Sequence, residues 1–311
     1  MKAATGIAAL CAPLLLGAAR VPVEYVVQGD ALLPVRLNGR TATLRIDPAA
    51  PAMPLIHAEL AERGGLKMTG PFGVSIGYAV RPVPVTARTP VVRIDFDNRT
   101  VKRRVGWTSR PFAMVADGST GPEAMFEPIV RFQFHASVAG ERTLSLPMDR
   151  DSGPLGMFGN FGTTYARIQV GGEPMRVRFD PYHARSLVTA AAGARIAAVH
   201  GVEISGRAVP TEIFFGVERP VRTLTLHQPM QLGTLSIATL GLRAADDGSV
   251  RGIRDEEEHP VHVDPDEVVV TAKGKKHDPR RDTLSLGQDY LSRCSSLVFD
   301  RDAGVIRLTC A

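Results

Sequence analysis

An internal repeat constrains the fold of this chain more than any other feature of its sequence. Residues 35–48 read VRLNGRTATLRIDP, and residues 168–181, 133 positions further on, read IQVGGEPMRVRFDP. In each copy apolar residues alternate with others, a glycine turn follows, and the alternation resumes. A period of two that is interrupted at glycine predicts a β-hairpin. We therefore expect two hairpins whose second strands end on Asp47 and Asp180.

The similarity between the two halves continues beyond the hairpins. Each hairpin is followed by an alanine-rich segment that favours a helix, at 57–63 and at 190–199. Later in each half a glycine, Gly121 or Gly287, precedes a short helical signal and then a last strand or hairpin. Matching landmarks in the same order indicate a duplication.

The expected fold is mostly β, with homologous domains at about 30–150 and 160–311. Of the 311 residues, 44% are hydrophobic and 22% are charged, which is typical of a folded chain. No apolar run reaches the roughly 18 residues of a membrane span, so we expect no stable membrane insertion. The net charge of +5 is spread along the chain, which argues against nucleic acid as a partner.

The sequence contains no motif for a metal or a cofactor. Its three cysteines and eight histidines lack the spacing of a zinc site. His259 and His262 lie beside acidic residues, but a solvated charged loop explains them better than a weak metal site. We therefore expect neither a metal nor a cofactor.

The N-terminus resembles an export signal. Lys2 supplies a positive charge, an apolar stretch of about ten residues follows, and Gly17-Ala18-Ala19 offers a cleavage site. The alternative is a buried N-terminal helix. Lipidation at Cys11 is rejected, because Leu10 is too large for the preceding position. We expect residues 1–19 to be removed and the protein to be periplasmic or secreted.

Export would leave Cys294 and Cys310 as the cysteines of the mature chain. They bracket an apparent hairpin, which folds at residues 300–304 and brings the two sulfur atoms together. In an oxidising compartment the pair is expected to form a disulfide that closes about 15 residues, worth roughly 3 kcal/mol in the chain-entropy model. The alternative is two inert buried thiols.

The repeated pattern resembles a known family. Its features are a strand that ends on hydrophobic-Asp, an alanine-rich helix after it, and later Leu284-Ser-Leu-Gly287-Gln-Asp-Tyr-Leu before a closing hairpin. This combination resembles the retropepsin/pepsin-like aspartic proteases, in particular their two-lobed exported bacterial forms. The resemblance covers nearly all of the mature chain. It implies two small β-barrel lobes, with the active site in the cleft between them and one aspartate from each lobe.

The resemblance makes Asp47 and Asp180 the catalytic pair. Two facing carboxyl groups cannot both ionise easily, so they share one proton. The ionised aspartate takes a proton from a bound water, while the protonated one polarises the peptide carbonyl. The implied reaction is peptide hydrolysis without a covalent intermediate.

Both loops depart from the family motif Asp-Thr/Ser-Gly. They read Asp47-Pro48-Ala49-Ala50 and Asp180-Pro181-Tyr182-His183. Proline lacks the hydroxyl that normally links the loops, and Ala49 and Tyr182 add side chains where glycine lets the backbone approach the carboxylate. His183 could hydrogen-bond Asp180, whereas Ala50 has no group to do so.

These departures leave two functions open. One is an aspartic endopeptidase, and the other is an inactive pseudo-protease that binds an extended peptide or protein in the same cleft. A β-rich exported protein with no peptide site would require the repeat to be accidental.

Two further segments have only weak signals. Ser75 lies in a G-x-S-x-G pattern, but a proline-broken extended segment follows instead of a helix. The resemblance places Ser75 and Tyr78 near a flap over the cleft.

Residues 246–282 form a charged insertion. Within it, residues 266–272 resemble a short box that engages the TonB energising protein. An extra edge strand is the simpler interpretation of that segment.

Overall fold

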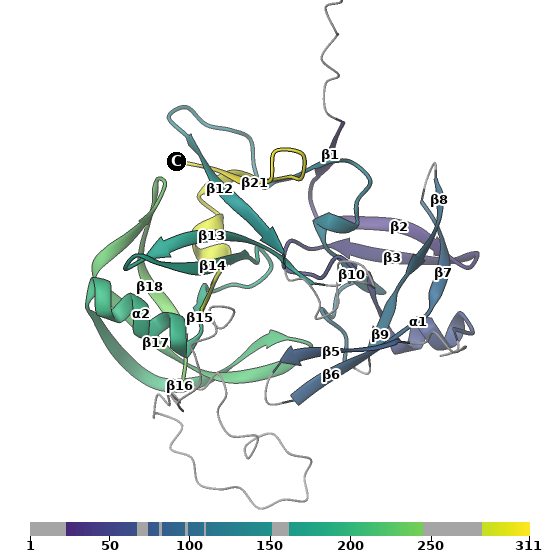
Figure 1. Ribbon diagram of the computed structural model, residues 1–311, viewed down its shortest axis with the longest axis horizontal. Helices are drawn as coiled ribbons and strands as arrows, with labels where there is room; N and C mark the ends of the chain where they lie inside the picture. The colour runs from purple at the N-terminus through teal and green to yellow at the C-terminus, as the bar shows by residue number, and fades with distance from the viewer. Residues whose placement is uncertain are drawn as a thin grey trace, which may run out of the picture.

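The computed structural model of the chain describes residues 23–66, 74–80, 83–96, 99–108, 110–150, 162–244 and 282–311 (Figure 1). The predicted export signal at 1–19 and the predicted TonB-like segment at 266–272 lie outside these ranges. So does the charged insertion, except for its last residue, Asp282. Ser75 and Tyr78 lie on strand β5, of which only the backbone is described.

Strands dominate the described residues, as the sequence predicts, and they form two sheets (Figure 1). The first sheet has nine strands in the order β5-β6-β9-β4-β10-β3-β2-β7-β8. Its strands are β2 (Leu32–Leu37), β3 (Arg40–Ile46), β4 (Leu55–His57), β5 (Val74–Val80), β6 (Val83–Thr89), β7 (Val91–Asp95), β8 (Thr100–Arg104), β9 (Gly106–Thr108) and β10 (Gly118–Thr120).

The second sheet has twelve strands in the order β1-β11-β20-β21-β12-β13-β14-β19-β15-β18-β17-β16. Its strands are β1 (Glu24–Val27), β11 (Ile129–Gln133), β12 (Arg142–Arg150), β13 (Thr164–Val170), β14 (Glu173–Phe179), β15 (Leu187–Val188), β16 (Val202–Phe214), β17 (Val217–Leu232), β18 (Leu235–Arg243), β19 (Thr283–Leu286), β20 (Cys294–Asp300) and β21 (Val305–Cys310). Strands β11 and β12 precede the second repeat in sequence, yet they pair with the closing strands β20 and β21, and β1 pairs in parallel with β11.

Both repeat hairpins form where the alternation predicts them, as β2–β3 and β13–β14. The alanine-rich segments are helices α1 (Ala58–Arg63) and α2 (Ala190–His200), and Thr189 caps α2 by accepting a hydrogen bond from Ala192 N–H. The two glycine signals lead into the short helices η1 (Pro122–Ala124) and α3 (Gln288–Leu291).

The two halves also share their strand pairing. Strand β3 pairs in parallel with β10, and β14 pairs in parallel with β19. Strand β10 pairs antiparallel with β4, as β19 does with β15. Strand β4 then pairs in parallel with β9, as β15 does with β18. Each half thus builds the same framework around the strand that ends on its aspartate.

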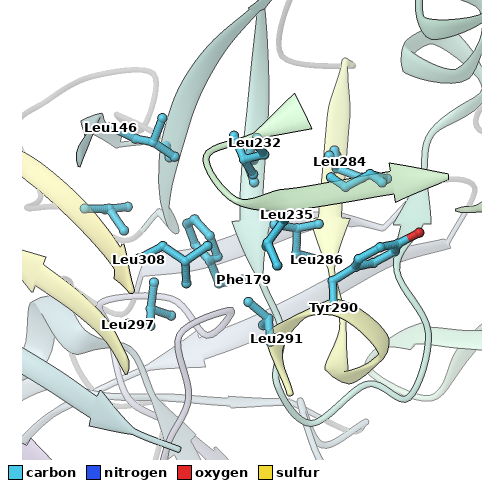
Figure 2. Packing of buried hydrophobic residues seen from close by; sticks show 14 of the residues in the cluster. Leu146, Phe179, Leu232, Leu235, Leu284, Leu286, Tyr290, Leu291, Leu297 and Leu308 are labelled. Atoms are coloured by element: carbon cyan, nitrogen blue, oxygen red, sulfur yellow. The ribbon is translucent and has the colours of Figure 1, made fainter. Parts of the chain in front are cut away.

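The main apolar core lies in the second sheet and holds the end of β14 rigidly. Phe179, directly before Asp180, is 1% exposed and packs edge-on against Phe299. Figure 2 shows Phe179 among leucines of β18, β19, β20, β21 and α3. Each fully buried side chain of this size contributes about 1.5–3 kcal/mol of transfer free energy. The core therefore fixes the backbone from which Asp180 projects.

The C-terminal hairpin is β20–β21, and a disulfide joins Cys294 to Cys310 at its open end. The predicted pairing of the two cysteines is thus present in the structure. The bridge spans a sequence separation of 16 residues. No helix within the described ranges is long and apolar enough to cross a membrane.

Candidate active site

The two aspartates occupy equivalent places in the two halves. The backbone N–H of Asp47 donates to Thr120 O at the end of β10 (2.9 Å), and that of Asp180 donates to Leu286 O at the end of β19 (2.8 Å). After each aspartate the chain turns, because the N–H three residues on donates to the aspartate's own carbonyl oxygen, at 3.0 Å for Asp47 and 3.1 Å for Asp180. The repeat therefore produces two loops with the same hydrogen-bond frame.

Both aspartates line one cavity of about 190 Å³. Asp47 is 2% exposed and Asp180 is 8% exposed, so both carboxyl groups are largely removed from water. The cavity combines these acids with a cation and with apolar side chains from both halves. Its lining residues are Arg45, Asp47, Phe112, Ala113, Met114, Asp180, His183, Glu212, Ile213 and Phe214.

The loops keep their backbone donors although glycine is absent. Ala49 N–H donates to Asp47 Oδ1 at 2.9 Å, and Tyr182 N–H hydrogen-bonds the Asp180 carboxyl group. The side chains that replace glycine at these positions therefore leave both backbone donors in place. Ala49 packs into an apolar cluster with Phe112, and the Tyr182 ring lies against Arg45, so neither side chain blocks its own N–H.

A tyrosine provides the link between the loops that proline cannot make. Tyr182 Oη donates to the carbonyl oxygen of Ile46, which directly precedes Asp47, at 3.2 Å. The guanidinium of Arg45 lies 4.2 Å from the centre of the Tyr182 ring, within the range of a cation–π contact. The second loop thereby contacts the strand that carries the first aspartate.

The electrostatic environments of the two acids differ. Burial raises the pKa of Asp47, but Arg45 and the Ala49 N–H oppose this, because both stabilise the ionised form. Burial, together with the negative charge of Asp47, raises the pKa of Asp180 to about 7. The pKa values of both acids are therefore raised, with burial the largest cause for each, and the negative charge of Asp47 acts on Asp180. Such mutual influence is expected of two carboxyl groups that share one proton.

His183 lies in the cavity but does not serve as the partner that the sequence suggested for Asp180. Its Nδ1 contacts the Arg185 backbone, and its Nε2 lies 3.0 Å from Glu212 O. Both ring nitrogens are therefore held by main-chain groups. The positive form of His183 still lowers the pKa of Asp180 through space.

Sequence reasoning missed the most distinctive residue of the site, Arg45. Its Nη2 donates to Asp47 Oδ2 at 3.1 Å, and the residue is 9% exposed. A signal for it was present, because the repeat places an arginine two residues before each aspartate, Arg45 and Arg178. The Arg178 guanidinium instead lies 5.9 Å from the centre of the Phe214 ring.

Sequence reasoning also missed the aromatic wall of the cavity. Phe112 stacks on Phe214 with ring centres 5.4 Å apart and meets Phe215 edge-on at 5.3 Å. Phe214 and Phe215 lie at the tip of the β16–β17 hairpin, whereas Phe112 belongs to the first half. No periodicity in the sequence links these distant segments, so only the folded chain reveals the contact.

The chain matches no protein-family model, and no curated protein matches it. Among the described residues no group of three or more His, Cys, Asp or Glu side chains is placed to hold a metal ion.

Proposed function

We propose that this protein is an exported aspartic endopeptidase of two pepsin-like lobes, in which Asp47 and Asp180 share a proton and activate water. One observation carries the proposal. Two aspartates from equivalent loops line the same cavity, and the charge of Asp47 contributes to an Asp180 pKa of about 7. Two carboxyl groups in one site, with the charge of one raising the pKa of the other, are an arrangement that acid–base hydrolysis uses.

In the proposed reaction the two acids have different roles. Ionised Asp47 takes a proton from water as the water oxygen attacks the peptide carbonyl carbon. When the C–N bond then breaks, Asp47 returns that proton to the leaving amine nitrogen. Protonated Asp180 donates a hydrogen bond to the carbonyl oxygen and stabilises the charge that develops there. The N–H groups of Ala49 and Tyr182 hold the two carboxyl groups in place. Activity should fall as the pH rises through about 7, because Asp180 then loses its proton.

A second function is supported by the ion pair at Asp47. The Arg45 guanidinium occupies Asp47 Oδ2 and stabilises the ionised carboxylate, which makes that carboxylate a weaker base. The same cavity would then bind an extended peptide or protein segment without cleaving it. The disulfide between Cys294 and Cys310 supports export for either function, because such bonds persist in oxidising compartments.

A cleavage assay tests the first function against the second. The oxidised protein is incubated with a diverse peptide mixture from pH 3 to pH 8, and new termini are identified by mass spectrometry. Wild type should cleave below about pH 7, and Asp180→Asn should lose at least about 100-fold of the rate, within the usual contribution of general acid–base catalysis.

Asp95→Asn serves as the control, since Asp95 lies on β7 and pairs with Arg93 outside the cavity. Equal cleavage by wild type and by Asp180→Asn would reject the proposed mechanism. No cleavage at any pH by the folded protein would leave peptide binding. Peptides retained by wild type in native mass spectrometry would then identify the ligand.

A further inference from the structure

Arg45 is unusual because a buried cation touches the proposed acid pair directly. It lies on β3, two residues before Asp47, and its guanidinium donates to Asp47 Oδ2 at 3.1 Å. The opposite oxygen, Oδ1, accepts the Ala49 N–H at 2.9 Å. Each oxygen of Asp47 therefore has a donor, one of them charged, which favours the ionised carboxylate.

The guanidinium is held in this position from a second side. The guanidinium carbon lies over the Tyr182 ring, and the Tyr182 hydroxyl group donates a hydrogen bond to Ile46 O. Within the described residues, Arg45 Nε is buried without a hydrogen-bond partner. A buried donor without a partner costs about 1–3 kcal/mol, so Arg45 is placed at the expense of one of its own hydrogen bonds.

The second loop lacks this arrangement although the repeat supplies the same residue. Arg178 lies two residues before Asp180, but its guanidinium lies over the Phe214 ring at 5.9 Å. Asp180 instead faces Asp47, whose negative charge favours the protonated form of Asp180. Of the two equivalent arginines, Arg45 thus donates to an aspartate of the pair, and this makes the two loops different.

We propose that Arg45 is a positioning residue that keeps Asp47 ionised and thereby leaves the shared proton on Asp180. Asp47 is then always the base and Asp180 always the acid. The inference rests on the proposed function only in taking these two residues as the facing pair, and it holds whether the site cleaves a peptide or only binds one.

Other charged and titratable groups around the pair do not account for this assignment. His183 and Tyr182 come from the second loop, Glu212 comes from β16, and Asp30 faces Tyr182 from the first half. His183 favours ionisation of Asp180, which opposes the assignment. Arg45 is the cation that donates directly to Asp47.

The test uses carbon-13 NMR of the aspartate carboxyl groups in the oxidised protein, so that it does not depend on catalytic activity. In wild type, Asp47 should remain ionised at pH 5.5 while Asp180 is still protonated. In Arg45→Met the Asp47 midpoint should rise by about 1–3 pH units, the range that a neighbouring arginine produces. Arg45→Lys should restore most of the difference, because the charge remains.

Arg178→Met is the matched control and should shift the midpoint of Asp47 by much less than Arg45→Met. Equal shifts in the two variants, or no shift in Arg45→Met, would overturn the role of Arg45. If Arg45→Met does not fold, wild type alone still decides, because a protonated Asp47 beside an ionised Asp180 at pH 5.5 would reject the proposal. An ordinary, independent titration of Asp180 in wild type would instead reject the facing pair and with it the proposed function.

Discussion

The Asp47 loop and the Asp180 loop have the same backbone but differ in their side chains. In each loop the aspartate N–H donates to the last residue of β10 or β19. The N–H three residues further on donates to the carbonyl oxygen of the aspartate. Asp47 pairs with a buried arginine, whereas the negative charge of Asp47 raises the pKa of Asp180. The comparison shows that a repeated sequence pattern can form the same framework twice while packing gives the two aspartates different neighbours.

The largest expected difference between the loops is the size of the stability loss when each acid is neutralised. Asp47→Asn leaves the buried Arg45 without its carboxylate, and we expect the free energy of unfolding to fall by about 3 kcal/mol. Asp180→Asn removes a carboxyl group that the fold already prefers neutral, so no such loss is expected. Urea denaturation at pH 8 measures both. Equal losses in the two variants would contradict the asymmetry.

The pH dependence of Asp180→Asn sharpens this comparison. The pKa of Asp180 is raised to about 7 in the folded state, so between about pH 4 and pH 7 the unfolded chain binds fewer protons than the folded one. The stability of wild type should therefore fall as the pH rises through that window. Because Asp180→Asn lacks this contribution, its stability relative to wild type should rise up to about pH 7 and then stay level.

Two glycines test whether the frameworks are equivalent. A Cβ on Gly121 would lie 2.9 Å from Pro51 O and closer still to Ala50 O, and one on Gly287 would lie 2.7 Å from His183 O. Alanine at either position must displace the aspartate loop of the same half. We expect each change to lower the free energy of unfolding by about 1–3 kcal/mol.

Chemical denaturation of Gly121→Ala and Gly287→Ala should therefore give similar losses. Gly39→Ala is the control, because its φ of 82° is strained for alanine but its Cβ would meet no atom within 4 Å. Its cost should be about 1–2 kcal/mol from backbone strain alone. A loss of stability in only one of the variants Gly121→Ala and Gly287→Ala would show that the two loops are not packed equally tightly.

The smallest expected effect belongs to the contact between the loops. Tyr182→Phe removes the hydrogen bond to Ile46 O but keeps the ring under Arg45, and should cost about 0.5–1.5 kcal/mol. Tyr290→Phe is the comparison, because Tyr290 Oη accepts from Ala238 N–H and Thr239 N–H and also donates to Thr239 O. Thermal unfolding should show the larger loss of stability in Tyr290→Phe. A larger loss in Tyr182→Phe would contradict the expectation that the contact between the loops contributes least.

Much of the framework could be predicted because its signals are local. Alternation around a glycine turn places the hairpins β2–β3 and β13–β14, and the alanine-rich segments become α1 and α2. Cys294 and Cys310 bracket a single hairpin, so their pairing also follows from nearby residues. Short-range periodicity determines backbone conformation, and it needs no knowledge of distant partners.

The repeat, the mostly β fold and the equivalent positions of Asp47 and Asp180 follow from the order of residues along the chain. Only in the folded chain does one of the two equivalent arginines reach an aspartate, and only there does Phe112 contact the tip of the β16–β17 hairpin. These outcomes depend on burial and on contacts between segments about a hundred residues apart. A residue's charge is written in the sequence, but its pKa depends on the neighbours that folding places around it.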